Sequence, residues 1–90
     1  MMEKEVILLN SEGLHARPSA LFVKEAIKFK SNILIESEGK QINAKSMISI
    51  LSSGLDQGAK IKIIANGEDE KEAVDVLSGM IEGKFGEKNG

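Results

Sequence analysis

This chain has 90 residues and no cysteine, so no disulfide can stabilise its fold, and we expect it to depend on a single hydrophobic core. A domain of this size buries only about 60% of the surface that its unfolded chain exposes, so the core is modest. A deep substrate cavity is hard to build in so small a chain, because such cavities usually lie between larger elements or domains. We therefore expect one domain over residues 1–90, with its function on the surface.

The composition limits what the surface of this protein can bind. The chain has three Phe, no Trp and no Tyr, and its net charge is -2, whereas nucleic-acid binders use aromatic platforms and a basic surface. One histidine and no cysteine leave only scattered carboxylates as metal ligands. No apolar run is long enough for a signal peptide or a membrane span. We expect a cytoplasmic protein that binds no nucleic acid, metal or cofactor and inserts into no membrane.

Hydrophobic patterning predicts seven elements in the order β-α-β-β-α-β-α. Short branched apolar runs predict strands over residues 5–10, 32–37, 40–43 and 60–65. Helical spacing predicts helices over residues 16–30, 46–53 and 69–84, with a turn over residues 56–58 and a frayed tail over residues 86–90. This order favours an α+β fold, an open-faced two-layer sandwich in which a four-stranded, mainly antiparallel sheet carries three helices on one face.

The buried faces of the helices also follow from the spacing. In the first helix we expect a buried face made of Ala16, Ala20, Val23 and Ile27, with an adjoining stripe of Phe22, Ala26 and Phe29. In the last helix the apolar face consists of Ala73, Leu77, Met80 and Ile81. The middle helix begins after Ser46, a good N-cap, and ends before Gly54.

The segment GLHARPSA, residues 13–20, places the only histidine between a glycine-broken loop and a predicted helix start. Backbone N–H groups and the positive end of the helix dipole favour an anion such as phosphate there, and Arg17 adds a forked cation. The same field should keep the His15 ring neutral, and a neutral ring nitrogen is a nucleophile. A lone histidine is usually an ordinary capping or surface residue, but the combination with Gly13, Arg17 and Pro18 indicates anion handling.

GLHARPSA closely resembles the active-site segment of HPr, the family of histidine-containing phosphocarriers in the bacterial phosphoenolpyruvate-dependent sugar phosphotransferase system. Residues 43–47, NAKSM, look like the family's regulatory serine segment, and the resemblance in length and element order covers essentially the whole chain. It implies that His15 accepts a phosphoryl group on Nδ1 from enzyme I and donates it to enzyme IIA domains of sugar permeases. It also implies that Arg17 supports the phosphoryl group, and that the protein is a transfer intermediate without enzyme activity.

The resemblance gives Ser46 a separate, regulatory role. It implies phosphorylation of Ser46 by an ATP-dependent HPr kinase/phosphorylase, after which the protein binds a transcription regulator of catabolite control. A phosphoryl group on imidazole is labile, whereas a phosphate ester on serine is stable. The serine ester is therefore suited to a regulatory signal. A helix N-terminus can accept the added charge of about -1.5 to -2. An ordinary N-cap role for Ser46 is compatible with this one.

A docking surface for partner proteins is expected beside His15. Leu21 lies off the main apolar face of the first helix. The middle helix is too short to bury Met47, Ile48 and Leu51 together, so we expect at least one of these three in the core and at least one exposed. The candidate docking residues are Leu14, Leu21, Lys24, Met47, Ile48 and Leu51. We expect the protein to be a monomer.

Several alternatives stay open or are disfavoured. A regulatory HPr-like protein would lack the active histidine, so His15 and Arg17 argue against it, whereas a carrier in a nitrogen-related phosphorelay remains possible. A small-molecule-binding domain would need a cleft or a dimer interface, for which no residues are arranged. An independent enzyme is disfavoured because His15 has no partner base of clear identity. Glu12 places a carboxylate where other members often have a small polar residue, and its role stays open, as do the sugars served and the use of Ser46.

Overall fold

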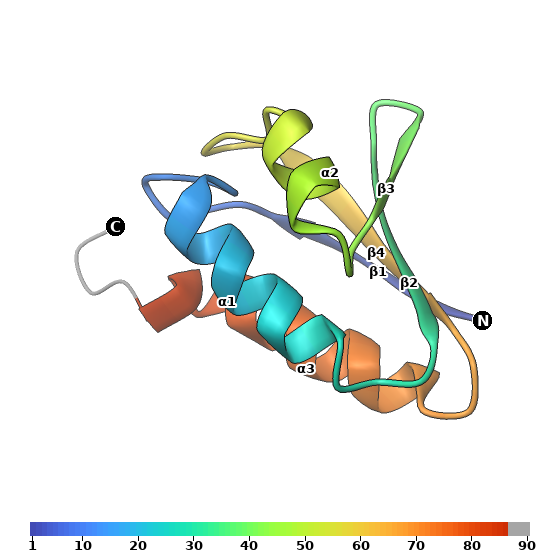
Figure 1. The fold of residues 1–90 in the computed structure, drawn as a ribbon. Helices are drawn as coiled ribbons and strands as arrows, with labels where there is room; N and C mark the ends of the chain where they lie inside the picture. The colour runs from blue at the N-terminus through green and yellow to red at the C-terminus, as the bar shows by residue number, and fades with distance from the viewer. Residues whose placement is uncertain (87–90) are drawn as a thin grey trace.

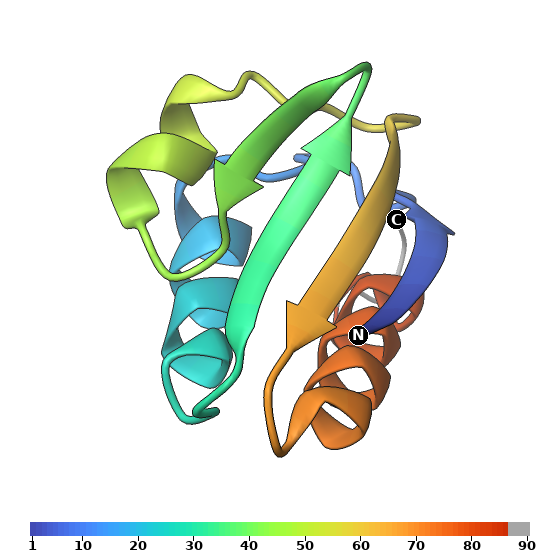
Figure 2. The same cartoon turned by 90° about the vertical axis from the view of Figure 1, so that its right-hand side faces the viewer.

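Residues 1–86, the part that the computed structural model describes, form one four-stranded sheet and three α-helices. The strands are β1 (Met2–Ile7), β2 (Asn32–Ser37), β3 (Lys40–Asn43) and β4 (Lys60–Asn66), and the helices are α1 (Ala16–Ala26), α2 (Met47–Ser52), α3 (Glu70–Glu82) and the short 3-10 helix η1 (Lys84–Gly86). The sheet order is β1-β4-β2-β3 and every neighbouring pair is antiparallel. Helices α1 and α3 cover one face, and α2 lies beside α1 at the β3 edge (Figures 1 and 2). The predicted α+β open-faced sandwich is confirmed.

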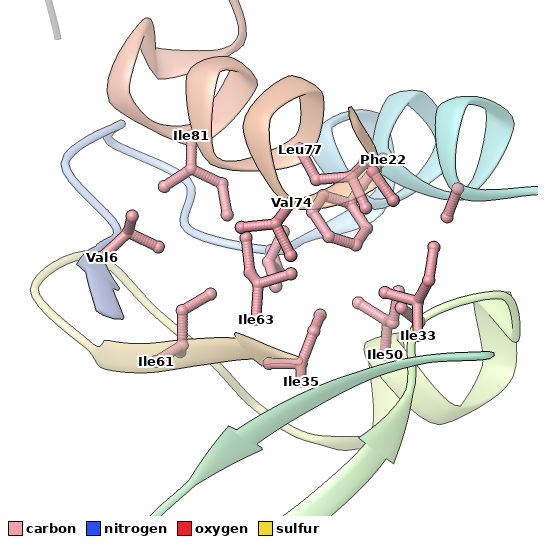
Figure 3. Packing of buried hydrophobic residues seen from close by; sticks show 14 of the residues in the cluster. Val6, Phe22, Ile33, Ile35, Ile50, Ile61, Ile63, Val74, Leu77 and Ile81 are labelled. Carbon is pink, nitrogen blue, oxygen red and sulfur yellow. The ribbon is translucent and has the colours of Figure 1, made fainter. Parts of the chain in front are cut away.

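The core fills the space between the sheet and the helices (Figure 3). Alternate residues of the two central strands point toward the helices, as the pleat of a strand requires. The buried residues of the strands and helices include Val6, Phe22, Ile33, Ile35, Ile50, Ile61, Ile63, Val74, Leu77 and Ile81. Helix α3 uses the predicted face, with Ala73, Leu77 and Ile81 buried and Met80 partly buried.

Strand β1 covers residues 2–7 instead of the predicted 5–10. It pairs with β4 from Met2 opposite Ala65 to Ile7 opposite Lys60. Because β4 begins at Lys60, the ladder ends at Ile7, and beyond it only Leu8 is paired: its N–H donates to the carbonyl of Ala59 (2.9 Å) and its carbonyl accepts the N–H of Gly58 (2.7 Å). The apolar run suggested a later strand, but this edge strand accommodates charged side chains on its solvent side.

Helix α1 is shorter than predicted, and of its predicted broad buried face only the adjoining stripe of Phe22, Ala26 and Phe29 is buried throughout. It ends at Ala26 instead of Lys30, with Ile27 as the C-cap. Its buried residues include Ser19, Phe22 and Ala26, whereas Ala16, Ala20 and Ile27 are exposed and Val23 is partly buried. The predicted main face was wrong because the large ring of Phe22 gains more from burial than the small alanine side chains do.

Helix α2 follows the prediction closely. The Ser46 hydroxyl accepts a hydrogen bond from the N–H of Ser49 (3.2 Å), which is the geometry of an N-cap. Gly54, just after the helix, has a φ of 69°, in the left-handed region that glycine adopts without strain. The frayed tail predicted for residues 86–90 concerns mainly residues 87–90, which lie outside the described part. Within that part, no helix has the length and hydropathy needed to cross a membrane.

Candidate functional site

His15 is the N-cap residue of α1. Its backbone is extended, with φ -78° and ψ -164°, and its carbonyl accepts the N–H of Ser19 (2.9 Å). The imidazole makes no capping hydrogen bond, and the side chain is 58% exposed. The ring therefore stands at the positive end of the helix, accessible to a partner molecule.

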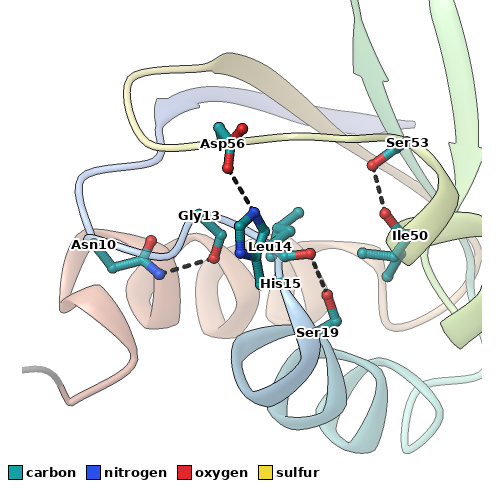
Figure 4. Close-up of polar contacts among 8 residues, drawn as sticks. All are labelled: Asn10, Gly13, Leu14, His15, Ser19, Ile50, Ser53 and Asp56. Atoms are coloured by element: carbon teal, nitrogen blue, oxygen red, sulfur yellow. Dashed lines mark hydrogen bonds and ion pairs between the residues drawn. The ribbon is translucent and has the colours of Figure 1, made fainter.

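Three short hydrogen bonds hold the loop that leads to His15, and Figure 4 shows the two made by the side chains of Asn10 and Ser19. The side-chain amide of Asn10 donates to the carbonyl of Gly13 (2.8 Å), and the hydroxyl of Ser19 donates to the carbonyl of Leu14 (2.7 Å). The N–H of Leu14 donates to the carbonyl of Leu55 (2.9 Å), which ties this loop to the segment before β4. Asn10 and Ser19 are buried, so these bonds lie away from competing water and fix the loop.

The side chain of Leu14 is buried in the core, with only 2% of its surface exposed. The prediction that Leu14 contributes to a docking surface is therefore wrong. A leucine directly before an exposed histidine anchors the loop, because burying a leucine side chain stabilises the fold by about 1.5–3 kcal/mol. The sequence position beside His15 did not reveal this, since neighbouring side chains in a turn point in different directions.

Asp56 is the residue that the sequence analysis missed. The Nε2–H of His15 donates a hydrogen bond to Oδ1 of Asp56 at 2.6 Å (Figure 4). An ionised carboxylate only accepts, so in a neutral ring this contact places the proton on Nε2, and Nδ1 is then the nitrogen that keeps its lone pair. The two residues are 41 positions apart in the chain, and the sequence showed Asp56 only as part of a turn. No short-range motif could have connected them.

Arg17 and Lys24 are exposed on α1, one in its first turn and the other in its last. Both positions leave the cationic groups accessible from the solvent side, as the sequence analysis expected. Within residues 1–86, no group of three or more His, Cys, Asp or Glu side chains is arranged to hold a metal ion.

Lys45 and Ser46 lie directly before α2, and Lys45 joins this point to the segment that follows α1. The ammonium group of Lys45 donates to the carbonyl of Phe29 (2.7 Å), and the partly buried Ser46 caps α2. Helices α1 and α2 are also in contact with each other. The histidine and the serine thus begin two helices that are packed against each other (Figure 1).

The candidate docking residues of α2 are more exposed than predicted. Ile48 is 77% exposed and Leu51 44% exposed, while Met47 is partly buried. The expectation that one of these three belongs to the core was wrong, because Ile50 alone anchors the helix. On α1, Leu21 is partly buried against the core. Two large apolar side chains of a six-residue helix therefore face solvent.

Comparison with known proteins shows which family this chain resembles in sequence and in structure. Residues 2–83 match the model of the family described as "PTS HPr component phosphorylation site". The HPr-like protein Crh of Halalkalibacterium halodurans is 46% identical over 91% of this chain and 98% of its own length. The phosphocarrier protein HPr of Buchnera aphidicola is 50% identical over 87% of this chain and 92% of its own. The crystal structure of HPr-C-His from Thermoanaerobacter tengcongensis superimposes with a TM-score of 0.95 at 49% identity, covering 98% of this chain and 99% of that one. This chain belongs to the HPr family of phosphocarriers of the phosphotransferase system.

Proposed function

We propose that this protein accepts a phosphoryl group from enzyme I on Nδ1 of His15 and passes it to enzyme IIA domains of sugar permeases. The observation that supports this most is the placement of the imidazole: it is exposed at the start of α1, and it contacts Asp56 through Nε2, so that Nδ1 lies outside this hydrogen bond. An unprotonated ring nitrogen can attack phosphorus directly. The helix N-terminus and the exposed guanidinium of Arg17 offer the transferred group a favourable potential.

The carrier needs no catalytic base of its own for this reaction. Nδ1 supplies its lone pair to phosphorus while the bond between phosphorus and the donor breaks, and the donor keeps that electron pair. Donation to enzyme IIA reverses these roles. Positioning and charge stabilisation dominate phosphoryl transfer, and the partner protein can complete both around an exposed ring.

Incubation with phosphoenolpyruvate and catalytic enzyme I tests the proposal. We expect a mass increase of one phosphoryl group that is labile in acid, absent in His15→Ala, and transferred when an enzyme IIA domain is added. Arg17→Ala should slow both steps while the protein remains folded. The absence of a mass increase, with an enzyme I that phosphorylates another carrier, would contradict the proposal.

We further propose that Ser46 is the target of an HPr kinase/phosphorylase and that its phosphate recruits a transcription regulator of catabolite control. Ser46 caps α2 beside the exposed Ile48, so a phosphate there changes the charge of the surface without entering the core. Ser46→Asp should keep a capping oxygen, add negative charge and slow phosphorylation by enzyme I. An unchanged rate would count against this regulatory role.

A second candidate is a purely regulatory protein, and one observation favours it: the 46% identical relative from Halalkalibacterium halodurans is named an HPr-like protein Crh. In that case Ser46 would be phosphorylated and His15 would not. Kinase labelling of Ser46 together with the enzyme I assay distinguishes the two functions. The exposed, Asp56-bound imidazole makes us favour the carrier.

We propose that the protein acts as a monomer in the cytoplasm. One solved HPr from Thermoanaerobacter tengcongensis is described as a dimer and gives a TM-score of 0.77 at 49% identity. The single chain has a radius of gyration of 11.6 Å, with which the value from small-angle scattering can be compared. Light scattering gives the molar mass. A molar mass of twice 9.7 kDa at micromolar concentration would contradict the monomer.

A further inference from the structure

We infer that Asp56 is a positioning residue for His15: its carboxylate fixes the ring with Nδ1 free and stabilises the positive charge that the ring acquires when Nδ1 takes a phosphoryl group. This inference rests on the proposed function, because it concerns the nucleophile that the proposal assigns. The contact that carries it is the 2.6 Å hydrogen bond from Nε2–H of His15 to Oδ1 of Asp56.

The chemistry of the step explains why a carboxylate at Nε2 matters. The form of the ring that can react is the neutral one with its proton on Nε2, because Nδ1 then has a lone pair. When the Nδ1 lone pair forms the bond to phosphorus and the bond to the donor breaks, the proton stays on Nε2 and the ring becomes a cation. A carboxylate at Nε2 attracts that cation more strongly than the neutral ring, so it lowers the barrier. An aspartate that orients a histidine and stabilises its imidazolium has the same role in serine proteases.

Asp56 is held in place by the loop that positions His15. The N–H of Leu14 donates to the carbonyl of Leu55, and the carbonyl of Asp56 accepts the N–H of Ala59 (3.1 Å). The backbone of residue 13 runs so close to residue 56 that a Cβ on Gly13 would lie 2.6 Å from the Cα of Asp56. The histidine and the aspartate therefore stand on two segments that are joined through their backbones.

The expected effect is moderate because both side chains lie largely in solvent, with 58% of His15 and 69% of Asp56 exposed. Water and salt screen such a pair. We expect the loss of the Asp56 charge to slow phosphorylation about two- to fivefold, the size typical of an exposed charge pair. Raising the salt concentration to about 1 M should shrink this difference, since the Debye length then falls to about 3 Å.

Phosphoramidate, a small phosphoryl donor that releases ammonia, tests the inference without any partner protein. Asp56→Asn keeps an oxygen that can accept from Nε2–H but removes the charge, and Asp56→Ala removes both. Glu38→Gln is the matched control, because Glu38 is an exposed carboxylate that lines the same groove as Asp56. We expect slower phosphorylation in both Asp56 variants, and the decrease in rate should be at least as large in Asp56→Ala as in Asp56→Asn. Glu38→Gln should be phosphorylated at the wild-type rate.

A spectroscopic measurement separates positioning from a general loss of structure. In 15N-labelled protein, the ring nitrogens of His15 should report a protonated Nε2 in the wild type and in Asp56→Asn, and a mixture of both tautomers in Asp56→Ala. A wild-type phosphorylation rate in Asp56→Asn would overturn the charge role, and wild-type rate and tautomer in Asp56→Ala would overturn the inference as a whole. Because phosphoramidate needs no enzyme I, either result is independent of whether enzyme I recognises the protein.

Discussion

The close contact between the backbones of residues 13 and 56 determines where His15 can lie. Gly13 has a φ of 58°, in the left-handed region, and a Cβ there would come within 2.7 Å of the carbonyl oxygen of Leu55. Only glycine meets both demands, because it has no Cβ and pays no penalty at positive φ. Glycine at this one position thus lets the backbone segments that carry His15 and Asp56 lie in contact.

Gly13→Ala should lower the free energy of unfolding by about 2 kcal/mol or more, from the left-handed backbone and the clash together. Gly39→Ala is the matched control, since Gly39 also has a positive φ, of 80°, but a Cβ there meets nothing within 4 Å. It should cost only the backbone term of about 1–2 kcal/mol. Urea unfolding measures both, and equal losses in the two variants would show that the close approach to residue 56 has no energetic weight.

At the scale of the elements, Asp69 joins the start of α3 to the turn before β2. Its carboxylate accepts the hydroxyl of Ser31 and the N–H groups of Ser31 and Lys30 (2.8–2.9 Å for the N–H groups). The hydrogen bond from the Ser31 hydroxyl, followed by that from the Lys30 N–H, lowers the pKa of Asp69 from its ordinary 3.8 to about 2. A lowered carboxyl pKa means that the folded state favours the ionised form.

The stabilisation by Asp69 should therefore be fully present above about pH 4 and be lost as the pH falls toward 2. As the pH falls from about 4 toward 2, the midpoint of unfolding should therefore fall less in Asp69→Asn than in the wild type. Some dependence remains, because the N-terminal ammonium and the Gly67 N–H lower the pKa of Glu70 as well. Asp75→Asn controls for the loss of one negative charge from α3, and a fall in Asp69→Asn as steep as in the wild type would contradict the assignment.

The sequence predicted those elements whose limits depend on local chemistry. The ends of β2, β3 and α2 are marked by turn glycines and by the Ser46 cap, and the structure has them at or within one residue of the expected positions. The limits of β1 depend on where β4 begins, and the buried face of α1 depends on how Phe22 fits the core. Both are tertiary effects, which local patterns do not contain.

At the scale of the whole molecule, helix α1, whose N-cap is His15, is in contact with helix α2. His15 itself was predicted from its local motif, whereas its partner Asp56 arrives from 41 residues away and becomes visible only in the folded chain. Ile48 and Leu51 are exposed apolar residues of α2, and Lys24 is an exposed cation of α1. Such a combination of apolar and charged groups suits docking of a protein with complementary chemistry.

Ile48→Ser should slow phosphorylation by enzyme I at least fivefold, because a central apolar contact of an interface typically contributes more than about 1 kcal/mol. The free energy of unfolding should change by no more than about 0.5 kcal/mol, since the side chain is 77% exposed. Phosphorylation by phosphoramidate should be unaffected. Val76→Ser, at an exposed position of α3, is the control, and equal rates with enzyme I in the two variants would remove Ile48 from the docking surface.

The most direct test of the account is the 15N spectrum of the protein after phosphorylation by enzyme I and phosphoenolpyruvate. We predict a coupling between 31P and Nδ1 of His15, with the proton retained on the Nε2 that faces Asp56. A phosphoryl group on Nε2 would contradict the role given to Asp56. A protein that acquires no phosphoryl group on His15 at all would contradict the carrier function itself.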